Sequence, residues 1–289
     1  MQILDSNYIP DIVIYHANCS DGFASKFVCM KKWGKIPLYL SKDHPSNIPI
    51  EDLDFDYEGK HILFVDFVYD NVEIMKDIQS KAASLYVIDH HCTALEKYKK
   101  VLNNFIFDSK KSASMITWDT LYPELKAPKI LEYIQDRDMR FWKLPYHHEV
   151  LSVLDSRPKE HAAWKEFNDY LTNDFNKVVQ EGTLLKEHFN SLLVSILSHK
   201  QVITIAGKEG FAVNCPWEFA SYAADKLAEN GDFGMAWFVN NSGKVKCSWR
   251  SNNGTNVKKI AEIFGGGGHV YNAGATITIK QISQILGYQ

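Results

Sequence analysis

Residues 85–91 of the chain read Leu85-Tyr86-Val87-Ile88-Asp89-His90-His91. Four apolar residues predict a buried β-strand, and one carboxylate and two imidazoles follow at its end. All three polar side chains are of a kind that binds metal ions, so their succession predicts a metal site where the strand ends. A tripeptide of this kind also occurs by chance on protein surfaces, so the prediction depends on what other strands bring to the same place.

Two other apolar segments end in residues of the same chemical kind. Residues 11–15 and 61–65 predict buried strands. The first runs into a polar turn that contains His16 and Asp21, and the second is followed at once by Asp66. Because ligands bind at the carboxyl ends of the strands in an open α/β sheet, these side chains are expected to converge on one site.

The order of strand and helix patterns predicts the organisation of the chain. Strands and helices alternate from residue 11 to about 155, which indicates a mostly parallel, doubly wound sheet covered by helices. A continuous helical pattern follows, and beyond it short strands flank a helix at 217–229. We therefore expect an α/β amino-terminal domain, a helical connector and a smaller α/β domain, at residues 1–155, 156–199 and 200–289 respectively.

Composition excludes several classes of protein. The 289 residues are 45% hydrophobic and 23% charged, which is typical of a globular protein with two modest domains. No apolar run approaches the roughly 18 to 20 residues of a membrane span, and the amino terminus has no pattern of a secretory signal. Neither a membrane partner nor secretion is therefore expected.

Cysteine usage and net charge further limit the expected cellular compartment and the kinds of binding partner. The five cysteines include no Cys-x-x-Cys pair and leave one over, which argues against a structural zinc site and a disulfide framework and favours a cytoplasmic protein. A net charge of −3 gives no general attraction for polyanions. Binding of long duplex nucleic acid is accordingly not expected.

A second motif lies near the carboxyl end of the chain. Ser248-Trp249-Arg250-Ser251 precedes a helical pattern at 257–264, and the glycine run 265–268 then leads into His269. Together with the Asp-His-His motif, in this order, the sequence resembles the DHH phosphoesterase superfamily, in the branch with a DHHA1 domain that includes RecJ-like exonucleases and nanoRNases. The resemblance spans about residues 11–280. It implies that the first domain is the metal-binding DHH domain and the last is a substrate-binding DHHA1 domain.

The resemblance also implies roles for individual residues of the first domain. Two divalent ions would activate water against a phosphodiester, and Mn²⁺ is expected, with Mg²⁺ or Co²⁺ as substitutes. Asp89, His90 and His91 are the implied catalytic residues, with Asp89 orienting an imidazole and His91 contacting phosphate. The implied metal ligands are His16, Asp21, Asp66, His90 and Asp136.

Two of these assignments leave alternatives open. Asp138 competes with Asp136 for the role of the ligand from the later acidic motif. Arg137 between them pairs with either aspartate, meets substrate phosphate or forms a structural ion pair. Cys19 stands where the best-known pattern of the family has an aspartate, and it is a further candidate ligand. Because a sulfur ligand is softer than a carboxylate, it would change the metal preference or weaken one of the two sites.

The glycine-rich motif is expected to bind the phosphate end of the substrate. Glycines have no side chains, so their backbone N–H groups can approach a phosphate closely. The residues expected to form this clamp are Arg250, Ser251, Gly266, Gly267, Gly268 and His269.

These features predict a metal-dependent phosphodiesterase that hydrolyses short oligonucleotides or small nucleotides. Two enzyme alternatives are a cyclic-dinucleotide phosphodiesterase and a phosphatase of bisphosphorylated nucleosides, because each would use the same metal centre. A nucleotide-binding regulator that has lost activity is the alternative outside enzymes, and it is motivated by Cys19. A homodimer is compatible with all of these functions.

Overall fold

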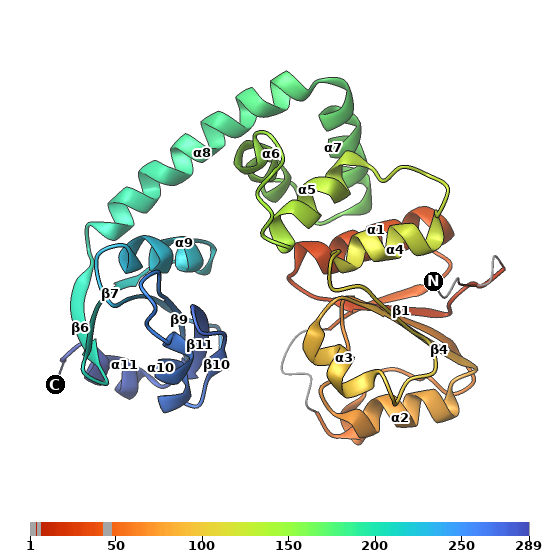
Figure 1. Cartoon of the computed structure of the whole chain (residues 1–289), viewed down its shortest axis with the longest axis horizontal. Coiled ribbons are helices and arrows are strands. Elements are labelled where there is room, and N and C mark those ends of the chain that lie inside the picture. Colours follow the sequence, from red (N-terminus) through yellow and green to blue (C-terminus); the bar gives the residue numbers. More distant parts are fainter. Residues whose placement is uncertain (1–3, 5–6, 43–47, 289) are drawn as a thin grey trace. The chain divides into compact units, whose positions relative to one another are not determined.

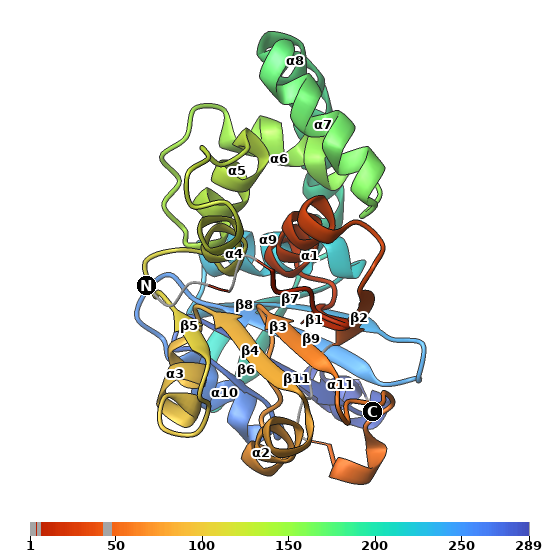
Figure 2. The same cartoon turned by 90° about the vertical axis from the view of Figure 1, so that its right-hand side faces the viewer.

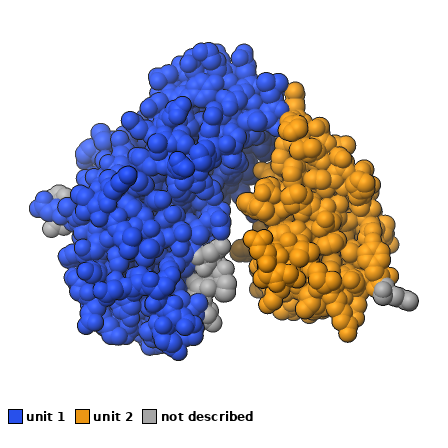
Figure 3. Space-filling view, turned by 180° about the vertical axis from the view of Figure 1, so that it is seen from behind, with its two compact units in different colours: residues 1–185 blue, residues 186–289 orange. Residues whose placement is uncertain are grey.

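The structure, a computed structural model, describes residue 4 and residues 7–42 and 48–288. The chain divides into two compact units, residues 1–185 and 186–289, which have different colours in Figure 3. The boundary falls within one long helix, α8 (Phe175–Leu197). The two units are described in turn.

The first unit contains a five-stranded sheet in which every pair of neighbouring strands is parallel. The strand order is β2-β1-β3-β4-β5. In chain order the strands are β1 (Ile12–His16), β2 (Leu38–Lys42), β3 (His61–Val65), β4 (Ser84–Asp89) and β5 (Phe105–Phe107).

Helices cover both faces of this sheet, with α1 and α4 on one side and α2 and α3 on the other (Figures 1 and 2). A short 3₁₀ helix, Ile50–Asp52, precedes β3. The α-helices of the unit are α1 (Ser20–Trp33), α2 (Val72–Lys81), α3 (Cys92–Tyr98), α4 (Ala113–Leu121), α5 (Lys129–Asp138), α6 (His147–Asp155) and α7 (His161–Asn173). The predicted doubly wound α/β architecture is confirmed.

Alternating side chains of the buried strands divide the apolar core into two layers. Ile12 and Ile14 pack with α2 and α3, whereas Val13 between them packs with α1 and α4 to α7. Because successive strand residues point to opposite faces, a strand buried on both faces has to be apolar throughout. This is why the apolar runs in the sequence identify the strands.

The strand order sets the position of the site. From β1 the chain crosses to β2 on one side, and from β2 it returns to β3 on the other side of β1. In a sheet of order 2-1-3-4-5 this reversal opens a crevice at the carboxyl ends of β1 and β3, where ligands bind. His16 and Asp66 come from these two strand ends, and Asp89 ends the neighbouring β4.

The second unit contains a six-stranded mixed sheet of order β10-β11-β9-β8-β7-β6, in which only β7 and β8 are parallel. Its strands are β6 (Gln201–Ile205), β7 (Lys208–Asn214), β8 (Phe233–Val239), β9 (Val245–Arg250), β10 (Gly267–Gly268) and β11 (Asn272–Ile277). Its helices are α9 (Trp217–Ala228), α10 (Val257–Ile263) and α11 (Ile279–Ile285). This is the smaller α/β unit that the sequence predicts.

Two strands without a counterpart in the sequence prediction, β5 and β10, have a plain physical reason. β5 has only three residues, too few for a pattern of period two to be recognised. β10 consists of two glycines, which have no β-propensity, and forms only because it pairs with β11.

Among the residues that the structure describes, no helix is long and apolar enough to cross a membrane.

Candidate metal centre

Asp66 lies at the centre of the ligand-type residues. It follows β3, has a left-handed backbone with φ of 58°, and is only 3% exposed. Its Oδ2 lies 3.5 Å from Nδ1 of His16, and its Oδ1 lies 3.5 Å from Nε2 of His90. An aspartate with positive φ is uncommon, and this conformation turns the carboxylate toward the imidazoles at the strand ends.

Two carboxylate oxygens at this site are buried without a hydrogen-bond partner. Among the described residues, Oδ1 of Asp66 and Oδ2 of Asp138 accept no hydrogen bond. The nearest imidazole nitrogen, Nε2 of His90, is 3.5 Å from the first and 3.6 Å from the second, which is too long for a hydrogen bond. Buried polar atoms are almost always satisfied, so two unsatisfied anionic oxygens beside one imidazole fit a bound cation.

The ligand atoms form three overlapping groups, in each of which they lie within 4.8 Å of one another. Asp66 belongs to two groups and His90 to two, so the groups form one continuous centre. Such a set of carboxylates and imidazoles would hold divalent ions, which activate water and neutralise phosphate charge when bound. The groups are His16, Cys19 and Asp66; Asp66, Asp89, His90 and His91; and Asp21, His90 and Asp138.

Gly22 allows α1 to begin directly against the first ligand. A Cβ at this position would lie 2.3 Å from the backbone oxygen of His16 and 2.8 Å from its Cβ. Only glycine tolerates such a distance, because any other side chain would push α1 away from β1. The close approach keeps Asp21, at the start of α1, next to His16 at the end of β1.

Asp21 is held by the amino terminus of a second helix. Its Oδ2 accepts a hydrogen bond from the N–H of Ala113 at 2.7 Å, and its Oδ1 accepts from the N–H of Ser114 at 3.1 Å and from the Ser114 hydroxyl. Burial, with Asp66 and Asp138 nearby, raises the pKa of Asp21 to about 7. A cation would relieve this repulsion between carboxylates.

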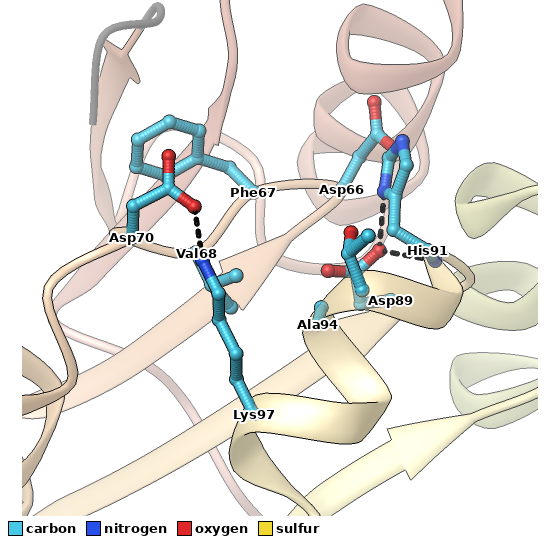
Figure 4. Close-up of a pocket in the computed structure, with 9 residues that line it drawn as sticks. Asp66, Phe67, Val68, Asp70, Asp89, His91, Ala94 and Lys97 are labelled. Carbon is cyan, nitrogen blue, oxygen red and sulfur yellow. Dashed lines mark hydrogen bonds and ion pairs between the residues drawn. The ribbon is translucent and has the colours of Figure 1, made fainter. Parts of the chain in front are cut away.

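Asp89 orients the two histidines that follow it. Its buried Oδ1 accepts hydrogen bonds from the N–H groups of His90 and His91, at 2.6 and 3.0 Å, and lies 2.7 Å from Nδ1 of His91. Figure 4 shows the His91 ring against Asp89 at a small pocket of about 80 Å³. Because its Oδ1 is hydrogen-bonded to the His91 ring, Asp89 fits the expected role of a residue that orients an imidazole.

Of the two aspartates at the end of α5, the structure favours Asp138 over Asp136 as the candidate ligand. The carboxylate of Asp136 accepts hydrogen bonds from the N–H groups of Lys143 and Leu144, at 2.9 and 3.4 Å, and is not in the ligand groups. Asp138, two residues on, brings its Oδ2 to 3.6 Å from Nε2 of His90. We therefore replace Asp136 by Asp138 in the candidate ligand set.

Cys19 is brought to the centre, at the position that precedes α1. Its sulfur groups with His16 and Asp66, and the side chain is half-buried. Burial and the nearby Asp66 carboxylate raise the pKa of the thiol above its usual range. A thiol in this setting is protonated, and only a cation would favour its thiolate form.

The carboxylates and imidazoles of the centre shift each other's pKa values. Burial alone would lower the pKa of His90, but the contact with Asp66 and the Asp21 and Asp138 carboxylates outweigh it and raise that pKa to about 9. Burial would raise the pKa of Asp66, but contacts with His16 and His90 and the charge of His91 lower it to about 2. The Asp66 carboxylate therefore favours its ionised form, and the imidazole of His90 beside it favours its protonated form.

Arg137 does not reach the ligand groups. Its Nη1 donates to Oδ2 of Asp155 at 2.7 Å, and its Nη2 donates to the hydroxyl of Ser20 at 2.7 Å. Among the described residues, Arg137 thus forms a structural ion pair with Asp155 of α6 rather than with either neighbouring aspartate, while its bond to Ser20 ties α5 to the start of α1.

The second unit has a separate polar hollow at the glycine-rich motif. Arg250 lies in it, with Nη1 donating to the Ser248 hydroxyl at 2.9 Å and Nη2 to the Ser221 hydroxyl at 2.8 Å. The lining residues come from β9, β10 and β11: Ser248, Arg250, Gly267, Gly268, Asn272, Ala273 and Gly274. Ser248 was missed in the sequence, although its spacing of two from Arg250 on a strand predicts the same face.

Three residues expected in the clamp are not among those lining this hollow. Gly266 packs against β11, where a Cβ would lie 2.2 Å from the backbone oxygen of Gly274. Ser251 is buried and its hydroxyl donates to the backbone oxygen of Thr255. His269 is exposed, and its N–H is used in a bond to the Asn272 oxygen at 2.7 Å. Arg250, Gly267 and Gly268 remain as the candidate binding residues.

Comparison with known proteins identifies the carboxyl-terminal unit. Residues 211–287 match the DHHA1 domain family. The uncharacterized protein R106 of Acanthamoeba polyphaga mimivirus is 30% identical over 280 residues, which cover 90% of this chain and 65% of the relative. The chain thus spans less than two thirds of the length of this curated relative.

Two solved structures resemble the chain over almost its whole length. The pGpG-specific phosphodiesterase PggH of Vibrio cholerae has a TM-score of 0.52 at 14% identity, covering 95% of this chain and 96% of its own. An uncharacterized protein from Helicobacter pylori G27 has a TM-score of 0.42 at 17% identity, covering 96% and 99%. At such identities the likeness to PggH concerns the fold.

The fold and the matched domain together define the class of this protein: a parallel α/β unit with a carboxylate and imidazole centre, followed by a DHHA1 domain. The carboxyl-terminal unit is thus a DHHA1 domain, and the chain as a whole shares its fold with PggH.

Proposed function

We propose that this protein is a divalent-metal-dependent phosphodiesterase that hydrolyses short oligonucleotides or small nucleotides. The observation that carries the proposal is the buried Oδ1 of Asp66, which accepts no hydrogen bond and lies among the ligand-type side chains of His16, His90 and His91. The DHHA1 domain at residues 211–287 and the fold shared with the pGpG-specific phosphodiesterase PggH support it. Mn²⁺ is the proposed metal, because carboxylates and imidazoles suit it.

Each residue of the centre has a proposed task. His16, Asp21, Asp66, His90 and Asp138 hold two divalent ions, which supply a nucleophilic water and neutralise phosphate charge when bound. The contact with Asp89 helps to raise the pKa of His91 against the effect of burial, so His91 donates a hydrogen bond to a phosphoryl oxygen. Cys19 is an additional ligand that makes one of the two positions softer.

The DHHA1 unit is proposed to bind the end of the substrate that is not cleaved. Arg250 carries its charge in a hollow whose other walls are glycine backbone and small polar side chains. A guanidinium held by Ser221 and Ser248 is oriented before a phosphate arrives, which favours bidentate binding. A small hollow of this kind favours short substrates over long strands.

The experiment that tests the proposal is a substrate series. Purified protein with Mn²⁺ is incubated with labelled RNAs from two to about twenty-four nucleotides, beside a His90→Ala control, and products are resolved over time. Fast cleavage confined to the shortest RNAs supports the proposal. The same assay with cyclic dinucleotides and bisphosphorylated nucleosides tests the two alternative substrates. No turnover of any of them, with nucleotide binding retained, would indicate a regulator that binds nucleotides without cleaving them.

Metal binding is expected to strengthen as the pH rises. His90 has its pKa raised to about 9 and is protonated at pH 7 in the metal-free protein, whereas a ligand imidazole has to be neutral. Proton and metal therefore compete, and the apparent Mn²⁺ affinity should rise by up to about tenfold for each pH unit below 9. Calorimetry at pH 7 in two buffers of different ionisation enthalpy measures the released protons. Binding without proton release would contradict the assignment of His90.

A further inference from the structure

The segment after α5 combines aromatic and basic side chains on the surface. Residues 139–148 read Met-Arg-Phe-Trp-Lys-Leu-Pro-Tyr-His-His and contain no acidic residue. Phe141, Trp142 and Tyr146 are 40%, 45% and 57% exposed. Large exposed aromatic rings among basic groups are typical of surfaces that bind single-stranded nucleic acid or free nucleotides. The metal centre and the arginine hollow use none of these residues.

The segment is firmly attached to α5. The Asp136 backbone oxygen accepts from the N–H of Phe141 at 2.9 Å, and its carboxylate accepts from the N–H of Lys143. The hydroxyl of Tyr133, one turn earlier on α5, donates to the backbone oxygen of Pro145 at 2.8 Å. The segment begins directly after Asp138, a candidate metal ligand. The hydrogen bonds that engage the Asp136 carboxylate thus also fix this segment, which follows Asp138 directly in the sequence.

The backbone of the segment is strained at three bulky residues. Arg140, Trp142 and Tyr146 have φ of 54°, 51° and 54°. Side chains of this size rarely adopt the left-handed region, and such strain persists only where surrounding bonds impose it. The conformation that exposes the rings is therefore maintained against the local preference of the chain.

The indole of Trp142 packs against two histidine rings and remains partly exposed. Its ring stacks on His148, with 5.7 Å between centroids and 30° between planes, and lies 5.0 Å from the ring of His147. These histidines begin α6, where His147 is half-buried and His148 is exposed, and 45% of Trp142 remains exposed. Lys143 lies over the Phe141 ring, with Nζ 5.6 Å from its centroid.

We propose that residues 140–148 form a nucleobase-binding surface, in which a base of the substrate stacks on Trp142 and Arg140 and Lys143 attract its phosphate. The inference rests on the proposed function, and it assigns the base-recognition step to the unit that carries the metal centre. Stacking is tolerant of base identity, because every base has a π-face. The surface therefore selects for nucleotides over other phosphoesters and discriminates weakly among bases.

The test measures binding of two phosphates that differ only in the base. Equilibrium dialysis of the Mn²⁺-loaded protein compares labelled adenosine 5′-monophosphate with ribose 5-phosphate, neither of which is a phosphodiester. We expect the wild type to prefer the nucleotide by about tenfold or more, and Trp142→Ala to reduce that preference to less than about threefold. Trp142→Phe, which keeps an aromatic face, should retain most of it.

Trp217→Ala is the matched control, because Trp217 is also an exposed tryptophan, at 62%, but starts α9 in the second unit. It should leave the preference at the wild-type value. Equal binding of the two phosphates by the wild type, or an unchanged preference in Trp142→Ala, would overturn the inference. An absence of RNA cleavage would refute the proposed function separately, because this binding ratio requires no hydrolysis.

Discussion

Asp66→Asn is expected to lower kcat/KM for a short RNA by about a thousandfold or more, because the carboxylate shared by two of the ligand groups loses its charge. Asp66 is the residue that lies between the His16 side and the His90 side of the centre, so one substitution affects both ion positions. The asparagine has nearly the same shape but carries no charge and turns a donor toward the imidazoles. Turnover at saturating Mn²⁺ and the number of bound ions, measured by calorimetry, are the two readouts.

A second aspartate on the same unit provides the control for this variant. Asp119 on α4 pairs with Lys111 at 2.6 Å near the surface, where an ion pair contributes only about 0–1 kcal/mol. Asp119→Asn should keep both turnover and metal content. The assignment of Asp66 would be refuted by wild-type turnover in Asp66→Asn, provided that circular dichroism shows the same fold.

Asp138→Asn and Asp136→Asn are expected to have opposite effects. The Oδ2 of Asp138 is buried beside His90 and accepts no hydrogen bond, and burial and the nearby Asp66 carboxylate raise the pKa of Asp138. Its removal should therefore cost metal binding rather than stability. We expect Asp138→Asn to lower kcat/KM by about a hundredfold or more, with little change in Tm.

Asp136→Asn should instead lower the stability. Its two carboxylate oxygens accept from the N–H groups of Lys143 and Leu144, and an asparagine can accept only one of these bonds. An unsatisfied buried N–H costs about 1–3 kcal/mol, which lowers Tm by several degrees. Thermal unfolding and turnover of both variants at one Mn²⁺ concentration separate the two roles. If Asp136→Asn lost metal and Asp138→Asn lost stability, the original assignment of Asp136 would be restored.

Much of the metal centre could be predicted because its residues are tied to strand ends. Apolar runs identify β1, β3 and β4, and parallel strands place their carboxyl ends at one edge. His16, Asp66 and Asp89 therefore had to come together once the strands were recognised. The strand order itself followed only from the packing of helices on both faces.

The glycine-rich motif was less predictable for a physical reason. Its residues are neighbours in sequence, but Gly267 and Gly268 belong to a strand at the sheet edge while Gly266 packs against β11. Ser248 and Asn272 enter the hollow from β9 and β11, because pairing of these strands brings their side chains to one face. Such partners depend on strand register, which the motif alone does not contain.

The amino-acid sequence by itself determined the fold class and the convergence of His16, Asp66 and His90, because local hydrophobic patterns and the direction of parallel strands suffice for both. Only the tertiary structure decided between Asp136 and Asp138. The two lie two residues apart in the last turn of α5, and a helix turns by about 200° between them, so they face opposite sides. The sequence does not say which side meets the metal centre. The packing of α5 against α1 turns Asp138 toward His90 and leaves Asp136 to hold the aromatic segment.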